Sequence, residues 1–165
     1  MITIRKATNN DSVDITNLIL NIWINEYHFD VNKDDAPDLQ DIESHYHKNN
    51  GLFFVAVKDD VLIGTIAGSA LSENEWVLKR MFVNENYRRS GIAQLLLEKL
   101  LSEIFILTGN EKSSVFLSTR EIESPAPKAF YLKNGFCVVE KLELPVNFPY
   151  FYEDNLFMMR SDLKI

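Results

Sequence analysis

The chain has 165 residues, of which 46% are hydrophobic and 25% are charged, and its formal net charge is −7. This length and composition are typical of one globular domain, so we expect residues 1–165 to form a single domain. Non-specific nucleic-acid binding needs a basic surface, and the acidic balance therefore argues against a nucleic-acid partner.

Cysteine content and targeting signals indicate the cellular compartment and exclude some kinds of site. Cys137 is the single cysteine, which excludes an internal disulfide and a zinc site built from several cysteines. No stretch of about 18 apolar residues predicts a membrane span, and residues 1–6 lack the apolar segment of a signal peptide. We therefore expect a cytoplasmic protein without a membrane partner, in which Cys137 lies buried on a strand. His45 and His47 would point to different sides of a helix, so we expect no metal site.

The N-terminal half predicts a strand, two helices and then three long strands. Asp11 is expected to be the N-cap of the first helix, and Pro37 begins a second helix that ends at Gly51. The apolar positions of these helices are Ile15, Leu18, Ile19, Ile22 and Trp23, followed by Leu39, Ile42 and Tyr46. The expected strands are residues 1–7, 52–57, 61–70 and 76–83, and the last three form a meander.

The C-terminal half alternates helices with strands. A helix begins near Ile92 and ends at Gly109, and a short helix over residues 127–133 ends at Gly135. The apolar stripe of the first of these helices is Ile92, Ala93, Leu96, Leu97, Leu100, Leu101, Ile104 and Leu107. The expected strands are residues 115–119, which should be buried on both faces, 136–142 and 156–160. The order β-α-α-β-β-β-α-β-α-β-β predicts an α/β fold with a mixed sheet.

The most informative stretch joins the strand at residues 76–83 to the helix at Ile92. The first four N–H groups of a helix lack internal partners and lie at the positive end of the helix dipole. Gly91 has no Cβ, and Arg88 and Arg89 add positive charge to an acidic chain. Together these features indicate a site for a phosphate or diphosphate. The same residues are also consistent with an ordinary helix start that carries two solvated arginines.

Two motifs resemble the GNAT superfamily of acyl-CoA-dependent N-acyltransferases. The turn after the long strand reads Arg88-x-x-Gly91-x-Ala93, similar to the family's Gln/Arg-x-x-Gly-x-Gly/Ala turn. Residues 129–136 are similar to the family's Tyr-x-x-x-Gly-Phe, with Tyr131 as the tyrosine. The order of elements matches the family across nearly the whole chain. The resemblance implies a central, mostly antiparallel sheet with one splayed parallel pair and flanking helices.

The chain departs from the family pattern at a few positions. Glu85 stands where members often have proline, and Ser124 stands where asparagine is frequent. Pro125 and Pro127 make the entry to the last helix unusual. These departures concern the region expected near the thiol of the cofactor.

The resemblance implies that acetyl-coenzyme A is the co-substrate and that no metal is needed. The implied cofactor-binding residues are Met81, Phe82 and Val83 for the pantetheine arm, and Arg88, Arg89, Ser90, Gly91, Ile92 and Ala93 for the diphosphate. A backbone N–H near Met81 and Phe82 would stabilise the developing oxyanion. Tyr131 would protonate the departing thiolate, although a tyrosine taken alone more often packs its helix against the sheet.

The resemblance also implies that an amine attacks the thioester directly in a ternary complex. Neither the amine nor the general base is selected by any spacing in the sequence. The base candidates are Glu26, His28, Asp30, Glu75 and Glu121. The expected acceptor region holds the aromatic cluster Trp23, Tyr27, His28 and Phe29, with Tyr46 near it, and Glu26 and Asp30 would make it a pocket for a cation.

A second aromatic segment, residues 145–152, is expected to cover the acceptor site or to form a homodimer contact. Two other functions stay open at this point. One is a catalytically inactive acyl-CoA-binding sensor of the same fold, and the other is an unrelated α/β nucleotide binder that uses the same helix terminus.

Overall fold

The computed structural model describes residues 1–109, 112–121, 126–151 and 154–163. Ser124, Pro125 and Tyr152, which the sequence singled out, lie outside the described residues. The chain divides into two compact units, residues 1–69 with 80–100 and residues 70–79 with 101–165. Each unit is described by itself below, and the single domain expected from length stays a prediction.

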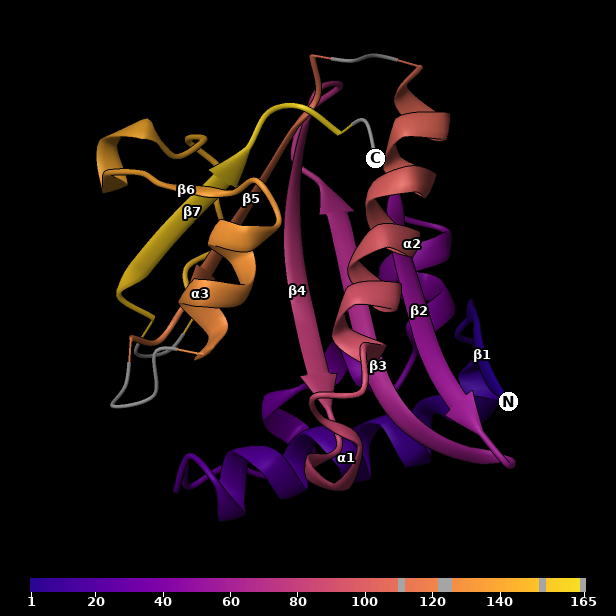
Figure 1. Cartoon of the computed structure of the whole chain (residues 1–165). Helices are drawn as coiled ribbons and strands as arrows, with labels where there is room; N and C mark the ends of the chain where they lie inside the picture. Colours follow the sequence, from indigo (N-terminus) through magenta and orange to yellow (C-terminus); the bar gives the residue numbers. More distant parts are fainter. Residues whose placement is uncertain (110–111, 122–125, 152–153, 164–165) are drawn as a thin grey trace. The chain divides into compact units, whose positions relative to one another are not determined.

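The elements follow the predicted order closely (Figure 1). They are β1 (Ile2–Lys6), α1 (Ser12–Asn25), β2 (Gly51–Lys58), β3 (Val61–Ala70), β4 (Glu75–Val83), α2 (Ile92–Thr108), β5 (Ser114–Thr119), α3 (Ala126–Lys133), β6 (Cys137–Val138) and β7 (Leu156–Arg160). The strands form one sheet in the order β1-β2-β3-β4-β5-β7-β6. Strands β4 and β5 are parallel, whereas β1 with β2, β2 with β3, β5 with β7, and β6 with β7 are antiparallel. This confirms the predicted mixed α/β sheet.

The first unit is built around the β2–β3 hairpin. Asp59 and Asp60 occupy the turn with φ of 51° and 64°, the two left-handed conformations of a tight hairpin turn. The buried face of α1 contributes Ile15 and Ile19, which are fully buried in the same cluster as Phe53 of β2. The predicted hairpin and the apolar face of the first helix are therefore confirmed.

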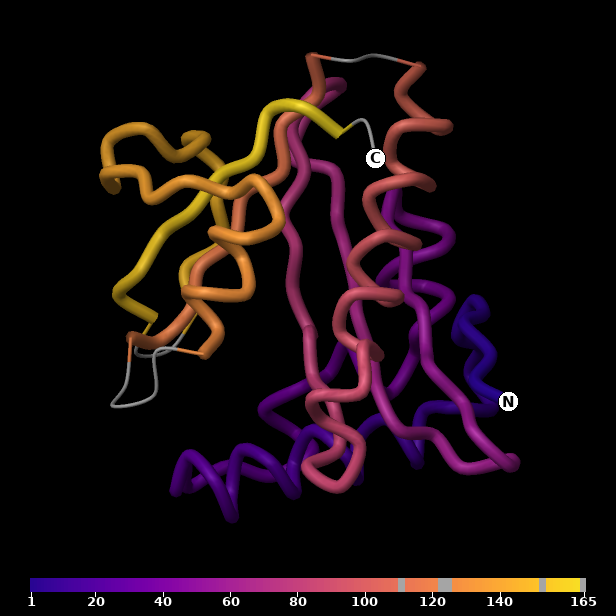
Figure 2. Tube along the Cα trace, in the orientation of Figure 1, coloured from indigo at the N-terminus to yellow at the C-terminus, as the bar shows by residue number. Residues whose placement is uncertain are grey.

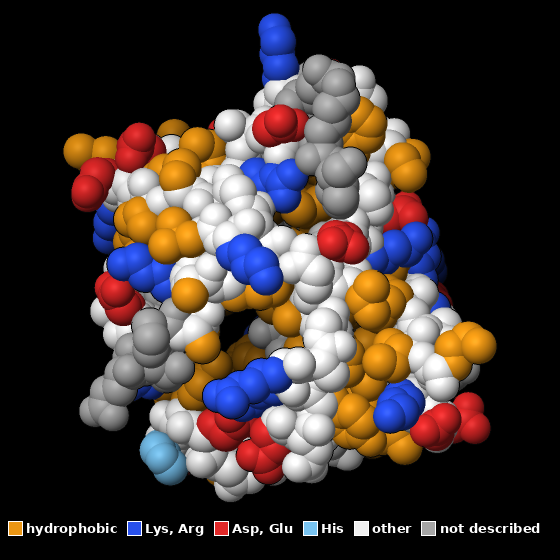
Figure 3. Space-filling view, viewed as in Figure 1, with side chains coloured by type: hydrophobic (Ala, Val, Ile, Leu, Met, Phe, Trp, Pro, Cys, Tyr) orange, Lys and Arg blue, Asp and Glu red, His pale blue; other side chains and the backbone are white. Residues whose placement is uncertain are grey.

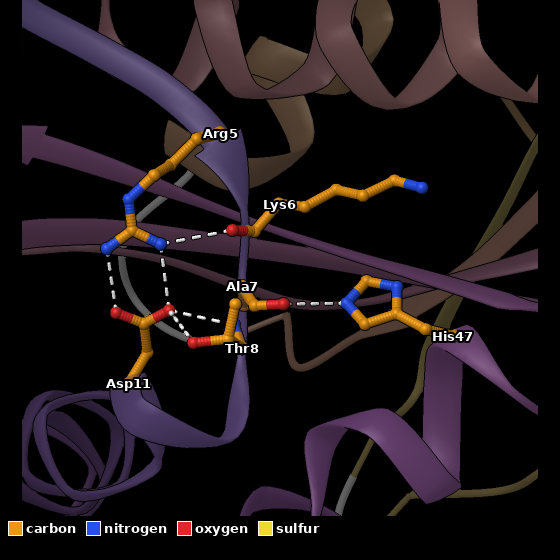
Figure 4. Close-up of polar contacts among 6 residues, drawn as sticks. All are labelled: Arg5, Lys6, Ala7, Thr8, Asp11 and His47. Atoms are coloured by element: carbon orange, nitrogen blue, oxygen red, sulfur yellow. Dashed lines mark hydrogen bonds and ion pairs between the residues drawn. The ribbon is translucent and has the colours of Figure 1, made fainter.

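Asp11 precedes α1 as predicted, but its carboxylate does not cap that helix. Arg5 donates two hydrogen bonds to the two carboxylate oxygens at 2.8 Å each, and the Thr8 N–H donates another at 2.8 Å (Figure 4). In the same view the His47 ring lies against the carbonyl of Ala7, with its Nε2 at 2.8 Å from that oxygen. The carboxylate thus ties the end of β1 to the start of α1.

Replacing Asp11 with Asn should make stability less dependent on acid pH. The hydrogen bonds from Arg5, and then those from Thr8, hold the pKa of the Asp11 carboxyl below its usual value of 3.8. A depressed folded-state pKa contributes stability above the usual value, and this contribution is lost as pH falls through the lowered one. Urea unfolding at several pH values should show wild type more stable than Asp11→Asn at pH 7, with the difference vanishing in acid. The exposed Asp14→Asn variant is the control, and a pH-independent difference would contradict this account.

The prediction of one continuous second helix from Pro37 to Gly51 is wrong, because two short helical turns take its place. A 3-10 turn spans Pro37–Leu39 and a π-helical turn spans Glu43–His47. The Asp41 side chain lies between them and accepts a hydrogen bond from the Ser44 N–H at 3.1 Å, the contact that starts a new turn. Its predicted apolar face is nevertheless correct, since Leu39, Ile42 and Tyr46 are fully buried.

The second unit holds a smaller core on β5 and β7. Its buried members are Val77, Phe116, Val139, Leu144 and Phe148. Three consecutive residues of β5, from Val115 to Leu117, are buried, which confirms a strand covered on both faces.

Several predictions in the second unit are wrong. The strand expected over residues 136–142 is reduced to β6, because Glu140 and Glu143 cap a 3-10 turn that ends the strand. Cys137 lies on this short outer strand and is exposed rather than buried. Leu107 is 60% exposed and does not belong to the buried stripe of α2.

No helix in the described part of the chain is long and apolar enough to cross a bilayer. On the face shown in Figure 3, the acidic and basic side chains are interspersed among the described residues.

Candidate functional site

The turn that leads into α2 presents a run of backbone donors without acceptors. Before it, the Arg88 N–H bonds to the Glu85 carbonyl, and after it the Leu95 N–H bonds to the Gly91 carbonyl. Within the described residues, the N–H groups of the five residues 89–93 donate to no backbone or side-chain acceptor. Five consecutive donors at a helix start form the kind of site that binds a phosphate or diphosphate.

Gly91 keeps this turn open. Its φ is 82°, a left-handed conformation that side-chain-bearing residues rarely adopt, and a Cβ placed there would meet no atom within 4 Å. Arg89, two residues earlier, is also left-handed with a φ of 61°. The space beside Gly91 is therefore accessible to a ligand that approaches the backbone closely.

The positive charge of Arg88 is paired within the protein. Its guanidinium donates to both Glu26 carboxylate oxygens, at 2.6 and 2.8 Å, and its Nε donates to the Val83 carbonyl at 2.9 Å. Hydrogen bonding by Glu26 raises the pKa of Arg88 above its usual value. Arg88 thus fastens the turn to the end of α1 and to the last residue of β4. Arg89 is exposed, and no ion pair of its side chain occurs within the described residues.

Strand β4 is irregular at Arg80, just before the predicted cofactor-binding residues. Arg80 has a φ of 57° within the strand, which marks a local bulge. The buried Thr65 hydroxyl donates to the Arg80 carbonyl at 2.7 Å and fixes this conformation. Met81 and Phe82 follow the bulge and are half-buried, whereas Val83 is buried. Non-glycine residues in this conformation are uncommon and often lie at ligand sites.

The Arg80 side chain belongs to a buried polar cluster that the sequence did not reveal. Arg80 donates to the two Asp38 oxygens at 3.0 and 2.7 Å, and the Tyr46 hydroxyl donates to Asp38 at 2.5 Å. The guanidinium also lies over the Trp23 ring, 5.0 Å from its centroid. Burial, and then the adjacent Asp38 carboxylate, raise the pKa of Tyr46 above its usual value. Asp38 and Arg80 thus connect Tyr46 to Trp23, which the sequence predicted to lie near each other. The cation that lies beside the Trp23 ring is the Arg80 guanidinium.

Asp38→Ala should destabilise the first unit strongly. The Asp38 and Arg80 side chains are only 15% and 12% exposed, so removing one partner leaves a buried charge unpaired. Such a loss costs about 3–5 kcal/mol. Thermal or urea unfolding measures it, and the exposed Asp34→Ala variant should stay within about 0.5 kcal/mol of wild type. Equal stability of both variants would contradict a buried ion pair.

The parallel pairing of β4 with β5 is short. It joins Glu75, Trp76 and Val77 to Ser114, Val115 and Phe116. Both strands are described in full, yet the pairing stops there while β4 continues to Val83 and β5 to Thr119. The sequence predicted such a splayed pair through its family resemblance.

Tyr131 lies in the second unit, on α3. It is 6% exposed, and its ring makes edge contacts with Phe130 and Phe136 at centroid distances of 5.3 and 5.4 Å. Gly135 ends this helix with a φ of 83°, as predicted. The tyrosine and the Gly-Phe pair of the second motif thus meet in one cluster.

The candidate general bases have separate surroundings. Glu26 is held by Arg88, and Glu121 is exposed and pairs with Lys128 at 3.2 Å. Glu75 begins β4 and accepts a hydrogen bond from the Ser72 hydroxyl, so roughly 25 Å of strand separates it from Val83. His28 and Asp30 are exposed. No group of three or more possible metal-ligating side chains occurs in the described ranges.

The aromatic segment after residue 145 contributes mainly to the core of the second unit. Phe148 is buried and contacts Tyr150 and Phe157 edge-on. Tyr150 is 57% exposed, with the Lys141 ammonium 4.8 Å from its ring centroid. A homodimer contact through this segment stays a prediction.

Comparison with known proteins identifies the family. The family model described as the acetyltransferase (GNAT) family matches residues 16–136. The chain belongs to the GNAT family of acetyltransferases. This confirms the predicted fold class and the resemblance to the GNAT superfamily.

Solved acetyltransferase structures share this fold over nearly the whole chain. A GNAT-family acetyltransferase from Staphylococcus aureus Mu50 is 31% identical with a TM-score of 0.89, over 99% of this chain and 100% of that one. The PaiA N-acetyltransferase from Thermoplasma acidophilum, solved in complex with coenzyme A, is 20% identical with a TM-score of 0.72, over 98% and 99% of the chains.

The chain is also similar to N-acetylaspartate synthetases. The Xenopus tropicalis protein is 37% identical over 95 residues, which cover 56% of this chain and 34% of the relative. The human protein is 38% identical over 95 residues, covering 56% and 30%. The chain thus matches only about a third of the length of these relatives.

Proposed function

We propose that this GNAT-family chain transfers the acetyl group of acetyl-coenzyme A to a primary amine of a small molecule or peptide. The amine attacks the thioester directly in a ternary complex. The observation that carries the proposal is the run of five N–H groups, at residues 89–93, that have no acceptor among the described residues and lie beside the open space at Gly91.

The turn fits the diphosphate of the coenzyme on physical grounds. The N–H groups and the helix dipole stabilise negative charge, and a glycine with open space on its Cβ side allows an oxygen to approach the backbone. Arg88, fixed by Glu26 and Val83, holds these donors in place before the ligand arrives, and the exposed Arg89 adds charge at the rim. Preorganised donors bind without a further ordering cost.

The remaining roles follow the family resemblance. Met81, Phe82 and Val83, which follow the bulge at Arg80, pair with the pantetheine arm through their backbone. Acetyl-coenzyme A supplies an activated thioester carbonyl at this place. Tyr131 donates its phenolic proton to the thiolate that leaves.

Two observations bear on the chemical class of the acceptor amine, and they point to different classes. Two relatives are named for N-acetylaspartate synthesis, which suggests an amino acid. The net charge of −7 favours encounter with cationic amines instead. Other solved structures of similar fold are named for a ribosomal-protein alanine and for aminoglycosides, so the fold by itself does not choose the acceptor.

Isothermal titration with acetyl-coenzyme A, followed by an amine panel, tests the proposal. We expect saturable cofactor binding, and free thiol release with at least one member of a panel of aspartate, a polyamine, an aminoglycoside and a peptide N-terminus. Absence of cofactor binding would contradict the proposal. Tight binding without turnover on any amine would favour the inactive sensor instead.

A further inference from the structure

The Arg80 guanidinium is held in one orientation directly before the strand segment proposed to bind the pantetheine arm. Its Nε and Nη2 donate to the two Asp38 oxygens at 3.0 and 2.7 Å, and the guanidinium lies 5.0 Å from the centroid of the Trp23 ring. Asp38 thus uses two of the five N–H groups that a guanidinium carries. Burial lowers the pKa of Arg80 but the Asp38 carboxylate raises it, with a net rise above the usual value, so the side chain stays a cation.

The Nη1 end of this guanidinium is accessible to solvent. Within the described residues, Nη1 donates no hydrogen bond. The buried side-chain nitrogen and oxygen atoms that lack a partner in the same part of the chain belong to Ser12, His47 and Ser113, and Arg80 is not among them. Nη1 therefore reaches the surface, although the side chain as a whole is only 12% exposed. A guanidinium fixed by its neighbours, with donors left open, is preorganised to bind a carboxylate.

The bulge in β4 does not depend on this side chain. The Thr65 hydroxyl holds the Arg80 carbonyl at 2.7 Å, and that contact involves only the Arg80 backbone. The φ of 57° is a conformation that glycine adopts at lower cost than arginine. A bulge alone would therefore form more easily with glycine, so the strain of placing an arginine here points to a use for its guanidinium.

The guanidinium adjoins the proposed thioester position within the first unit. Met81 and Phe82 follow Arg80 directly in the chain, and the Trp23 ring contacts both the guanidinium and the Phe82 ring, whose centroid is 6.0 Å away. Trp23, Met81 and Phe82 are each half-buried, so all three contribute to the surface here. The ribbon and the trace show the end of β4 beside α1, the helix that carries Trp23 (Figures 1 and 2). A group bound by Arg80 would therefore lie next to the segment proposed to hold the thioester.

We propose that Arg80 binds a carboxylate of the acceptor, which is therefore an amine with a carboxylate close to its amino group, as in an α-amino acid. This inference rests on the proposed acetyl transfer and names the substrate class of that site. One carbon separates the amino group of an α-amino acid from its carboxylate, so a carboxylate held at Nη1 keeps the amine near Met81 and Phe82. The acceptor does not displace Asp38, because Asp38 bonds to the Nε–Nη2 edge and leaves Nη1 open.

Acceptors that differ only in the carboxylate test this inference in the wild-type protein. Aspartate, alanine and phenylalanine are each compared with their α-carboxamide and with the amine that lacks the α-carboxylate, in an assay of free thiol release. The carboxamide and the amine cannot form the ion pair with Arg80, so we expect kcat/KM to fall by at least about tenfold from the best amino acid to either analogue. Equal or higher kcat/KM for the analogues in every set would overturn the inference.

Arg80→Lys separates recognition of the carboxylate from support of the fold. Lysine keeps a positive charge for Asp38 but has neither the planar fork nor the Nη1 donors. The ratio of kcat/KM for the amino acid to kcat/KM for its carboxamide should fall about tenfold, toward one. A general loss of activity or stability affects both acceptors alike and cancels in this ratio. The matched control is Arg5→Lys, which alters an arginine paired with Asp11 on β1, two strands away from β4, and should keep the wild-type ratio.

The possible failures are distinguishable. A wild-type ratio in Arg80→Lys would overturn the role of Arg80, and if that variant does not fold, the comparison of acceptors in the wild type decides. A wild type that turns over no amine at all refutes the proposed function. A wild type that acetylates amines equally well with and without a carboxylate refutes only the inference about Arg80.

Discussion

Gly91→Glu is expected to abolish binding of acetyl-coenzyme A. The new side chain would enter the open space beside the turn and place a negative charge among the five N–H groups at residues 89–93. These groups would then have a carboxylate of the protein as their acceptor in place of the diphosphate. We expect the Kd measured by isothermal titration to rise by at least about a hundredfold, which corresponds to about 2.7 kcal/mol.

Gly109→Glu is the matched control for this variant. Gly109 follows the other end of α2, also has a positive φ, at 57°, and also has open space on its Cβ side. Both variants therefore carry a comparable backbone strain and the same added charge, but only Gly91 adjoins the unpaired donors. Equal affinity of wild type and Gly91→Glu would remove the diphosphate from this turn.

Tyr131→Phe is expected to lower turnover while leaving cofactor affinity intact. The ring stays in its edge contacts with Phe130 and Phe136, so the substitution removes only the hydroxyl. Loss of a general acid typically costs about a hundredfold or more in rate. Steady-state kinetics with the best amine of the panel should show the fall in kcat, and titration should show an unchanged Kd for acetyl-coenzyme A.

A comparison with Tyr150→Phe makes this test specific. Tyr150 lies in the same unit and also has aromatic neighbours, but the proposal gives it no chemical role, so its kcat should match wild type. If Tyr131→Phe also keeps the wild-type kcat, the tyrosine serves only to pack α3, and another group protonates the thiolate.

Most of the fold follows from local periodicity in the sequence. The alternation around residues 52–70 and the 3.6-residue stripe after Ile92 each express which face is buried, and that information is local. The prediction of a continuous second helix was wrong because the Asp41 side chain accepts a hydrogen bond from the Ser44 N–H. The spacing of apolar residues carries no information about such side-chain-to-backbone bonds. The predicted length of the strand after Phe136 was wrong for a related reason, since Glu140 and Glu143 form a capped turn in place of further strand pairing.

The features of the candidate site likewise fall into those that neighbouring residues predict and those that depend on residues far apart in the sequence. The turn at Gly91 could be predicted because its glycine, its arginines and the helix start are neighbours in sequence. The pairs Arg80 with Asp38 and Arg88 with Glu26 join residues 42 and 62 positions apart. Only the tertiary fold brings such partners together, so these pairs could not be predicted from one sequence.

An NMR titration of the 15N-labelled protein with coenzyme A tests the central claim most directly. The amide signals of residues 89–93 report the donors that lack acceptors in the structure. We predict that coenzyme A shifts these signals more than those of any other segment, and that pantetheine, which has no diphosphate, leaves them in place. Unmoved amides at residues 89–93 in the presence of saturating coenzyme A would contradict the account.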